Sequence, residues 1–300
     1  MYVILGATGN TGSVVANRLL DRGKKVRVVG RHAKKLTAFA SRGAEAFVAN
    51  LSDAEALTHA FAGAEAVYAM IPPDLASDNY RAVQSVAVES IAKALEKSGV
   101  KHAVTLSSFG ADKSDKTGPI AGLHGMESRL NQIEGLNVLH LRAGYFMENL
   151  LAQAGAIQTF GMMAGPVEAD VLLPMIATKD IGAAAAEVLL KLDFRGKHAQ
   201  ELQGQRDLNY TEAAKIIGEA IGKPGLEYVR LPDDQIIQAM GPMGISKNFA
   251  GLIIEMANAF NSGHIKMLEQ RSEKNTTPTS FATFVKEVFV TVYRGQAASA

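Results

Sequence analysis

The chain has 300 residues, of which 47% are hydrophobic, and this content is enough for one large domain or for a domain with an added lobe. The formal net charge of +1, without any run of basic residues, argues against direct contact with nucleic acid or an anionic membrane, and no apolar run approaches the roughly 18 residues that span a bilayer. The absence of cysteine excludes disulfides and thiolate nucleophiles and, together with the lack of a signal peptide, predicts a cytoplasmic protein.

An apolar strand at residues 3–5 leads into three glycines that are spaced three residues apart. Strand, glycine turn and helix follow one another in the order that binds the pyrophosphate of a dinucleotide. The first glycine allows a tight turn, the second admits the phosphates and the third lets the helix pack closely, while the helix N-terminus attracts negative charge. The alternative is an ordinary strand-to-helix connection. The predicted contacts are Gly6, Thr8, Gly9, Asn10, Thr11 and Gly12, with the side chains of Asn10 and Thr11 at the lip of the turn.

The second predicted strand, at 25–29, is followed by basic residues instead of an acidic one. An acidic residue at this point binds the ribose 2′-hydroxyl of NAD. Here Arg31 follows the strand and Lys35 lies four residues further on, and the two could hold a 2′-phosphate, the guanidinium with forked hydrogen bonds. The pattern therefore predicts NADP(H) as the cofactor. The alternative is a solvated basic turn.

Short apolar runs continue to alternate with helical patterns as far as residue 150. This alternation predicts an α/β fold with a Rossmann-like, doubly wound parallel sheet that helices cover on both faces. Further strands are predicted at 45–49, 66–71, 103–107 and 138–141, and helices at 52–61, 79–98 and about 120–133. The residues at strand ends are the other predicted cofactor contacts: Asn50 and Leu51, with Asn50 near the adenine, Ile71 and Pro72 in the loop after the fourth strand, and Ser107, while Ser108 is predicted to contact the substrate.

The pattern becomes irregular after residue 150. We expect an NADP(H)-binding domain at 1–150, to which 166–200 return, a smaller lobe for the substrate at 151–165 and 201–292, and a tail at 293–300. The segment 241–244 could move as a lid or could simply connect two helices. The elements predicted here are strands at 171–174, 201–203 and 228–230, and helices at 180–192 (capped by Thr178), 211–221, on either side of 241–244, and 280–292.

Several sequence motifs of this chain together resemble those of the NmrA-like branch of the atypical short-chain dehydrogenases/reductases. They lie between residue 3 and about residue 185. The resemblance implies NADP(H) binding and one of two kinds of protein: reductases, including quinone and flavonoid-type reductases, or regulators that sense the nucleotide without turning it over. The motifs are Gly6-Ala7-Thr8-Gly9-Asn10-Thr11-Gly12, Arg31, Leu106-Ser107-Ser108, Leu141-Arg142-Ala143-Gly144-Tyr145-Phe146-Met147-Glu148-Asn149 and Lys179-Asp180-Ile181-Gly182.

The chain departs from typical short-chain dehydrogenases at their Tyr-x-x-x-Lys pair, because none of its seven tyrosines has a lysine four residues later. The corresponding helix carries His124, and Ser128 stands where relatives with such a histidine have a lysine. An imidazole can exchange a proton near neutral pH. His124 is therefore the candidate proton donor or substrate contact, the alternative being a histidine that packs or orients a loop. Tyr145 and Phe146 could stack on a flat substrate, or could belong to the core.

Two functions remain open on this sequence. The first is an NADPH-dependent reductase of a small electrophilic molecule such as a quinone, whose oxygen can take a proton from water or a weak donor once hydride arrives. The second is an NADP(H)-binding sensor with a protein partner and little catalysis. A sugar-nucleotide epimerase is less consistent, because that reaction needs the missing tyrosine. The sequence shows no set of residues with metal-ligand spacing, and no metal is predicted.

Overall fold

Seven parallel strands form the central sheet of the computed structural model, which describes residues 1–295. Their order is β10-β6-β5-β4-β1-β2-β3, so the direction of winding reverses between β1 and β4. Ligands of open α/β sheets bind at such a switch point, beyond the carboxyl ends of the strands. The strands are β1 (Tyr2–Leu5), β2 (Val26–Gly30), β3 (Glu45–Val48), β4 (Ala66–Ala69), β5 (His102–Ser108), β6 (Asn137–Ala143) and β10 (Lys197–Leu202).

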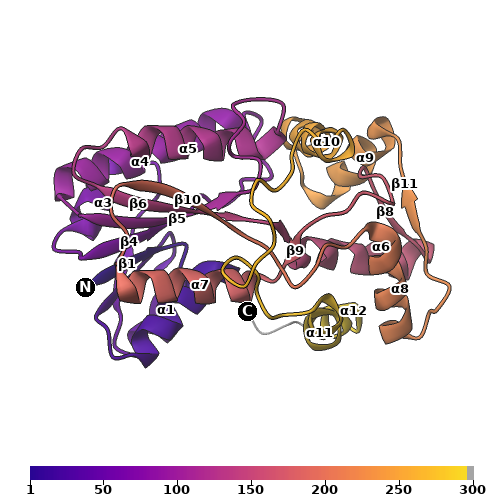
Figure 1. The fold of residues 1–300 in the computed structure, drawn as a ribbon, viewed down its shortest axis with the longest axis horizontal. Coiled ribbons are helices and arrows are strands. Elements are labelled where there is room, and N and C mark those ends of the chain that lie inside the picture. Colours follow the sequence, from indigo (N-terminus) through magenta and orange to yellow (C-terminus); the bar gives the residue numbers. More distant parts are fainter. Residues whose placement is uncertain (296–300) are drawn as a thin grey trace.

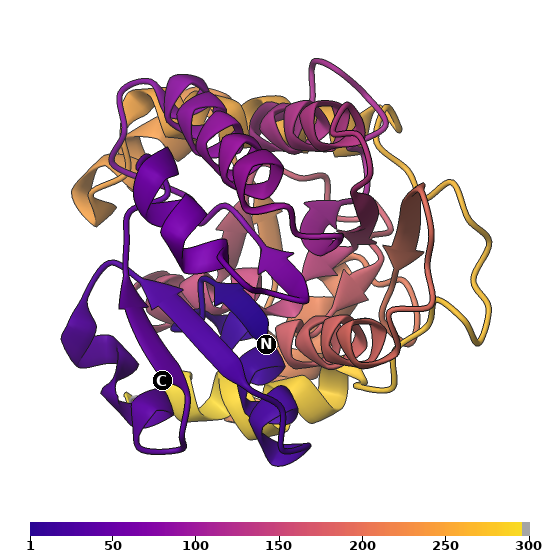
Figure 2. The ribbon, with the colours of Figure 1, turned by 90° about the vertical axis from the view of Figure 1, so that its left-hand side faces the viewer.

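Helices cover both faces of this sheet (Figures 1 and 2). One face is covered by α1 (Asn10–Asp21), α2 (Ala33–Ala40) and α7 (Thr178–Lys191), the other by α3 (Ala54–Phe61), α4 (Tyr80–Ser98) and α5 (Ala121–Asn131). Each layer encloses its own buried apolar cluster. The central strands β1 and β4 are buried along their whole length, which is why their sequences are continuous apolar runs.

A smaller lobe lies beyond the carboxyl ends of the strands (Figure 1). It has its own buried cluster, which includes Tyr210, Phe260 and Phe284. Two short strand pairs, β7 (Tyr145–Phe146) with β9 (Met175–Ile176) and β8 (Met163–Gly165) with β11 (Tyr228–Arg230), belong to this part of the chain. Its helices are α6 (Gln153–Phe160), α8 (Tyr210–Ile221), α9 (Asp233–Met240), α10 (Lys247–Asn261), α11 (Phe281–Phe284) and α12 (Val290–Tyr293), and a π-helical turn, Val285–Phe289, joins the last two.

The α/β fold with its doubly wound parallel sheet is confirmed. Several details of the predicted elements were wrong or incomplete, and helix α6 and the short strands β7, β8 and β9 were not predicted. Helix α2 was not predicted, because Leu36 and Phe39 are its only buried side chains. The strand expected at 171–174 is a single bridge between Leu173 and Leu208, and the next residue, Pro174, has no N–H group to extend it. Two further details concern β10 and α7.

The strand expected at 201–203 begins earlier, at Lys197, and extends the large sheet as β10. Thr178 is the first residue of α7 and does not cap it with its own side chain; its N–H and hydroxyl groups donate to the carboxylate of Glu148. The predicted tail at 293–300 lies outside the described residues from 296 onward, and residue 293 still belongs to α12. No helix within residues 1–295 has the length and hydropathy needed to cross a bilayer.

Candidate functional site

The glycine turn between β1 and α1 is fixed by backbone contacts. Gly6 has a φ of +63°, and a Cβ atom there would lie 2.4 Å from the Sδ atom of Met70. A Cβ atom at Gly12 would lie 2.3 Å from the carbonyl oxygen of Gly6. The N–H of Gly9 donates to that same oxygen over 2.9 Å. Glycine is therefore required at Gly6 for the turn and at Gly12 for the close approach of helix and strand.

The first turn of α1 has N–H groups that no side chain caps. The first intrahelical hydrogen bond runs from the N–H of Ser13 to the carbonyl of Gly9, and Thr8, Gly9 and Asn10 are exposed. The preceding N–H groups and the helix dipole would therefore favour an anion. The side chain of Thr11 was predicted to lie at the lip of this turn, and this prediction was wrong. The side chain is buried, and its hydroxyl accepts a hydrogen bond of 2.9 Å from the Tyr68 hydroxyl.

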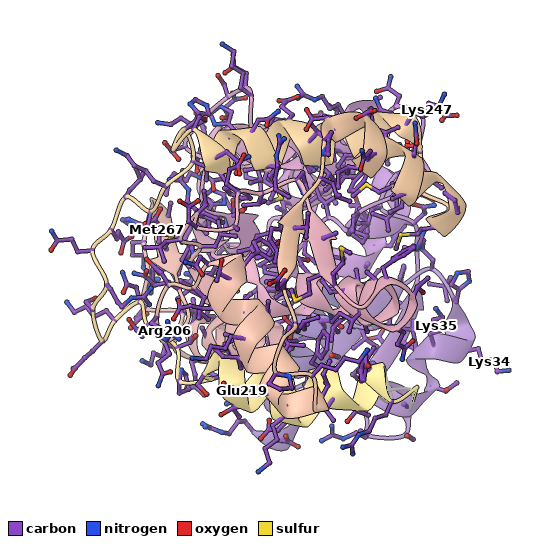
Figure 3. The ribbon with its side chains drawn as sticks, turned by 90° about the vertical axis from the view of Figure 1, so that its right-hand side faces the viewer. Lys34, Lys35, Arg206, Glu219, Lys247 and Met267 are labelled. Atoms are coloured by element: carbon purple, nitrogen blue, oxygen red, sulfur yellow. The ribbon has the colours of Figure 1, made fainter. Side chains whose placement is uncertain are left out.

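The predicted adenosine contacts follow β2 and β3, the strands beside β1. Arg31 lies just beyond the end of β2 and is exposed. Lys35, in the first turn of α2, is also exposed (Figure 3). Asn50 is exposed after β3, where its Oδ1 accepts from the N–H of Ser52 over 3.2 Å, and Leu51 is half-buried. Because the strands are parallel, these residues and the glycine turn share one edge of the sheet.

The exit of β4 borders the glycine turn on its other side. Met70 lies directly against Gly6, and the half-buried Ile71 and exposed Pro72 follow it. The structure thus brings together the glycine turn and the exits of β2, β3 and β4, which are the places where sequence analysis put the dinucleotide.

A buried network that sequence analysis missed lies at the ends of β5 and β6. The carboxylate of Glu127, on α5, accepts from the Ser107 hydroxyl over 2.6 Å and from Nε and Nη2 of Arg142 over 3.0 and 2.6 Å. These bonds to Glu127 raise the pKa of Arg142. Ser107 is 1% exposed, so its hydroxyl hydrogen is engaged inside the protein. The one signal in the sequence is Arg142 itself, a charged residue near the end of a mostly apolar strand.

His124 is half-buried on α5. Its Nδ1 lies 2.9 Å from the carbonyl oxygen of Ala111. Because a carbonyl can only accept, Nδ1 carries a hydrogen, and Nε2 of the neutral ring is left as an acceptor. The Ser128 hydroxyl lies 3.4 Å from Nε2. Ser108 is also half-buried, and its hydroxyl donates to the carbonyl of Phe109 over 3.0 Å.

The two aromatic residues after β6 contact the protein core. The Tyr145 hydroxyl lies 2.9 Å from that of Tyr210, and its ring packs edge-on against Phe260 with centroids 6.0 Å apart. Burial raises the pKa of Tyr145. Phe146 packs against the buried cluster between the sheet and α1. These contacts favour the core role for both side chains.

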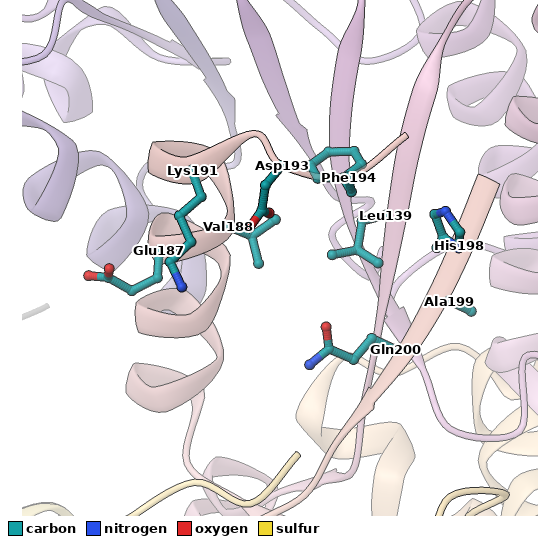
Figure 4. Close-up of a pocket in the computed structure, with 9 residues that line it drawn as sticks. All are labelled: Leu139, Glu187, Val188, Lys191, Asp193, Phe194, His198, Ala199 and Gln200. Atoms are coloured by element: carbon teal, nitrogen blue, oxygen red, sulfur yellow. The ribbon is translucent and has the colours of Figure 1, made fainter. Parts of the chain in front are cut away.

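Three hollows of the surface lie away from the glycine turn. One of about 450 Å³ lies between α7 and β10 (Figure 4). Another, of about 540 Å³, is lined by α10 and Lys116, and a third, of about 320 Å³, lies between α4 and α5. None of the predicted nucleotide contacts lines them. In the part of the chain that the structure describes, no three His, Asp or Glu side chains are placed to hold a metal ion.

Known proteins resemble this chain in sequence and in fold. Over 256 residues the chain is 28% identical to the NAD(P)H azoreductase of Xenophilus azovorans, and the match covers 85% of this chain and 86% of that protein. The structure of the NADPH-dependent quinone oxidoreductase QOR2 of Escherichia coli, complexed with NADPH, has a TM-score of 0.81 at 24% identity and covers 96% of this chain and 100% of its own. Citrobacter sp. triphenylmethane reductase, complexed with NADP(H), has a TM-score of 0.79 at 21% identity, with 95% and 99% covered.

The two solved structures establish the Rossmann-like fold of the chain. The family is established by a separate match, in which the profile of the NmrA-like family covers residues 2–284. This range includes both the large sheet and most of the smaller lobe. The resemblance predicted from the sequence is thereby confirmed, and the chain belongs to the NmrA-like family.

Proposed function

We propose that the chain is an NADPH-dependent reductase that delivers hydride to a small electrophilic molecule such as a quinone. The observation that carries this proposal is the glycine turn, whose uncapped helix lies beside the exposed Arg31 and Lys35. Relatives support it by their names, which are those of an azoreductase, a quinone oxidoreductase and a triphenylmethane reductase. The names of the azoreductase and the quinone oxidoreductase include NAD(P)H and NADPH, and the triphenylmethane reductase structure is a complex with NADP(H).

The residues present fit the cofactor. A side chain at Gly9 would enter the space beside the carbonyl of Gly6, 3.3 Å away, so glycine keeps this side of the turn open for a pyrophosphate. The N–H groups at the start of α1 would bind the phosphates. Arg31 and Lys35 would bind the 2′-phosphate, and Asn50, Leu51, Ile71 and Pro72 would flank the adenosine and the ribose.

The bound cofactor would supply the hydride, and the chain would orient the acceptor and provide a proton. His124 can give a proton from Nε2 only when the ring is doubly protonated, because Nδ1–H is engaged with Ala111. A quinone oxygen can otherwise be protonated by water after hydride arrives, so this chemistry does not need a Tyr-x-x-x-Lys pair. The acceptor would bind between Ser108 and the smaller lobe.

A second candidate is a sensor that binds NADP(H) with little turnover. The observation that favours it is the engaged state of the groups at the end of β5. The hydroxyl hydrogens of Ser107 and Ser108 are donated inside the protein, which leaves His124 as the predicted proton donor beside this strand end.

Two measurements, made one after the other, test the proposal. NADPH and NADH are first titrated against the full chain, and NADPH oxidation is then followed by absorbance with a panel of quinones. Tight NADPH binding with turnover of at least one quinone is the expected result. Tight binding without turnover across the panel would transfer support to the sensor. Absence of NADPH binding would contradict both functions.

A further inference from the structure

The loop that leaves β4 touches both the candidate nucleotide site and the smaller lobe. We define the β4 exit loop as residues 70–79. At its start, the side chain of Met70 lies against Gly6 of the glycine turn. Its later part approaches the amino end of α10, which Lys247 marks in Figure 3. The loop therefore connects the glycine turn to the amino end of α10.

Three hydrogen bonds join the end of this loop and the start of α4 to α10. The N–H of Ser246 donates to the carbonyl of Leu75 over 2.9 Å, and the Ser246 hydroxyl donates to the carbonyl of Ser77 over 2.6 Å. The Oδ1 atom of Asn248 accepts from the N–H of Tyr80 over 2.9 Å. We call these three bonds the clasp. Two of them end on carbonyls of the loop itself, so the clasp holds its backbone directly.

An apolar contact accompanies the clasp. The rings of Tyr80 and Phe249 meet edge to face with centroids 4.8 Å apart, and Leu252 completes a small buried cluster. Arg81 and Glu255 form an ion pair of 2.9 Å next to it, but both are partly exposed and add little. Burial of the two rings makes the amino end of α10 a firm attachment point for the loop.

The segment immediately before the clasp is held by few contacts. In α9 only Ile236 is buried, and the following turn, at 241–244, has no buried residue. Met243 in that turn is 62% exposed. A segment with so little burial opens at low cost in free energy. The segment leads directly into Ser246, so its carboxyl end is attached to the clasp.

We propose that the clasp couples nucleotide binding to the order of residues 233–245. A dinucleotide that contacts Ile71 and Pro72 fixes the β4 exit loop, the loop fixes the amino end of α10, and α9 with its following turn becomes ordered. This inference rests on the proposed binding of NADP(H). Coupling of this kind is reciprocal, so a molecule that orders α9 strengthens NADPH binding by the same factor.

A double variant separates the two ends of this coupling. Ser246→Asp keeps an acceptor for the N–H of Phe249, which Ser246 caps, but has no hydroxyl hydrogen to donate to Ser77. Asn248→Ala removes the acceptor for Tyr80. Asn248→Asp restores that acceptor and should restore part of the coupling. Asn209→Ala is the matched control, because it removes the cap of α8 in the same lobe without touching the loop.

Hydrogen–deuterium exchange of the full chain, with and without NADPH, measures the coupling. At an NADPH concentration of about 100 Kd, binding can slow exchange by at most roughly 100-fold, and we expect about tenfold slowing at 70–79 and at 233–245 in the wild type and in Asn209→Ala. In the double variant, 70–79 should keep its protection while the effect on 233–245 disappears.

The outcomes that overturn the inference are distinct from those that overturn the proposed function. If NADPH binds but leaves 233–245 unchanged in the wild type, the coupling is rejected and the proposed NADPH binding stands. An unchanged β4 exit loop would also reject the coupling and would remove Ile71 and Pro72 from the proposed site. If the double variant still transmits the full effect, the two side-chain bonds of the clasp are not its route. If titration detects no NADPH binding, the proposed function and the coupling fail together.

Discussion

At the scale of single residues, the choice between NADPH and NADH is predicted to depend on Arg31. Its guanidinium is exposed beyond β2, at the edge of the sheet that carries the glycine turn. A hydrogen bond to a charged group contributes about 1.5–3 kcal/mol, so Arg31→Ala should weaken NADPH binding by roughly 10- to 100-fold and leave NADH binding unchanged. Titration of both nucleotides measures the ratio.

Lys24→Ala is the control for this variant, because it removes the same charge from an exposed residue before β2, at the opposite edge of the sheet. It should leave both affinities near the wild-type values. Equal losses for NADPH and NADH in Arg31→Ala would contradict the assignment of the 2′-phosphate.

His124 gives a second prediction at this scale. Its Nδ1–H donates to Ala111, and the amide of a glutamine can replace that hydrogen bond without carrying a transferable proton. His124→Gln should therefore lower kcat with a quinone by about 10- to 100-fold and change NADPH affinity little. This loss lies at or below the low end of the range for general acid catalysis, because water can also supply the proton. The exposed His59→Gln is the control. Unchanged kcat would leave His124 with a structural role alone.

At the scale of elements, the position of α1 depends on its packing against α7. Gly182 faces α1, and a Cβ atom there would lie 2.7 Å from both the carbonyl oxygen of Thr11 and the Cβ of Val14. Thr11 belongs to the first turn of α1, where the phosphates are predicted to bind. A residue in the second half of the large domain thus determines how closely α1 approaches α7.

Gly182→Ala should lower the free energy of unfolding by about 1–3 kcal/mol, because the helices must move apart. It should also weaken NADPH binding, since the first turn of α1 moves with them. Gly155→Ala is the control: it lies in α6 with no atom within 4 Å of the added Cβ, and should gain about 0.5–1 kcal/mol from helix propensity. Urea unfolding and NADPH titration measure both effects. A Gly182→Ala protein as stable as the wild type would contradict this account.

The elements also show what the sequence could predict. The glycine turn was predictable because two of its constraints are local: the backbone at Gly6 has a positive φ, and a Cβ atom at Gly12 would meet the carbonyl oxygen of Gly6. Strand β10 was assigned only in part, because it is the edge strand of the sheet and its exposed His198 and Ala199 give no apolar run. Helix α2 was missed for a similar reason, since it buries only two side chains.

Contacts between distant segments could not be predicted from local patterns. The spacing of Ser107 gives no indication that its hydroxyl points to Glu127, twenty positions later. Thr11 likewise turns toward Tyr68 on β4 instead of toward the turn. Ser246 and Asn248 look like ordinary residues at a helix start, and only the folded chain places them against the β4 exit loop. Local backbone rules thus predicted the glycine turn, while side-chain partners required the structure.

At the scale of the whole molecule, the stability of the fold should depend on pH through His140. Its ring lies between β5 and α5, with Nδ1 2.7 Å from the Thr105 hydroxyl and Nε2 3.1 Å from Oδ1 of Asn131. The residue is 1% exposed, and burial lowers its pKa to about 4. The neutral ring therefore stabilises the folded state at neutral pH.

The sign of the pH dependence follows from the protons bound by each state. The unfolded chain protonates this histidine near pH 6.5 and the folded chain only near pH 4, so between these values the unfolded state binds more protons. The free energy of unfolding should fall by up to about 3 kcal/mol as the pH falls from about 6.5 to about 4.

Urea unfolding of the wild type and of His140→Gln across this pH range isolates the effect of His140. Glu148 and Glu201, whose pKa values burial raises, act with the opposite sign but are present in both proteins and cancel in the difference. The exposed His59→Gln should behave as the wild type, and a His140→Gln protein with the wild-type pH dependence would contradict the prediction.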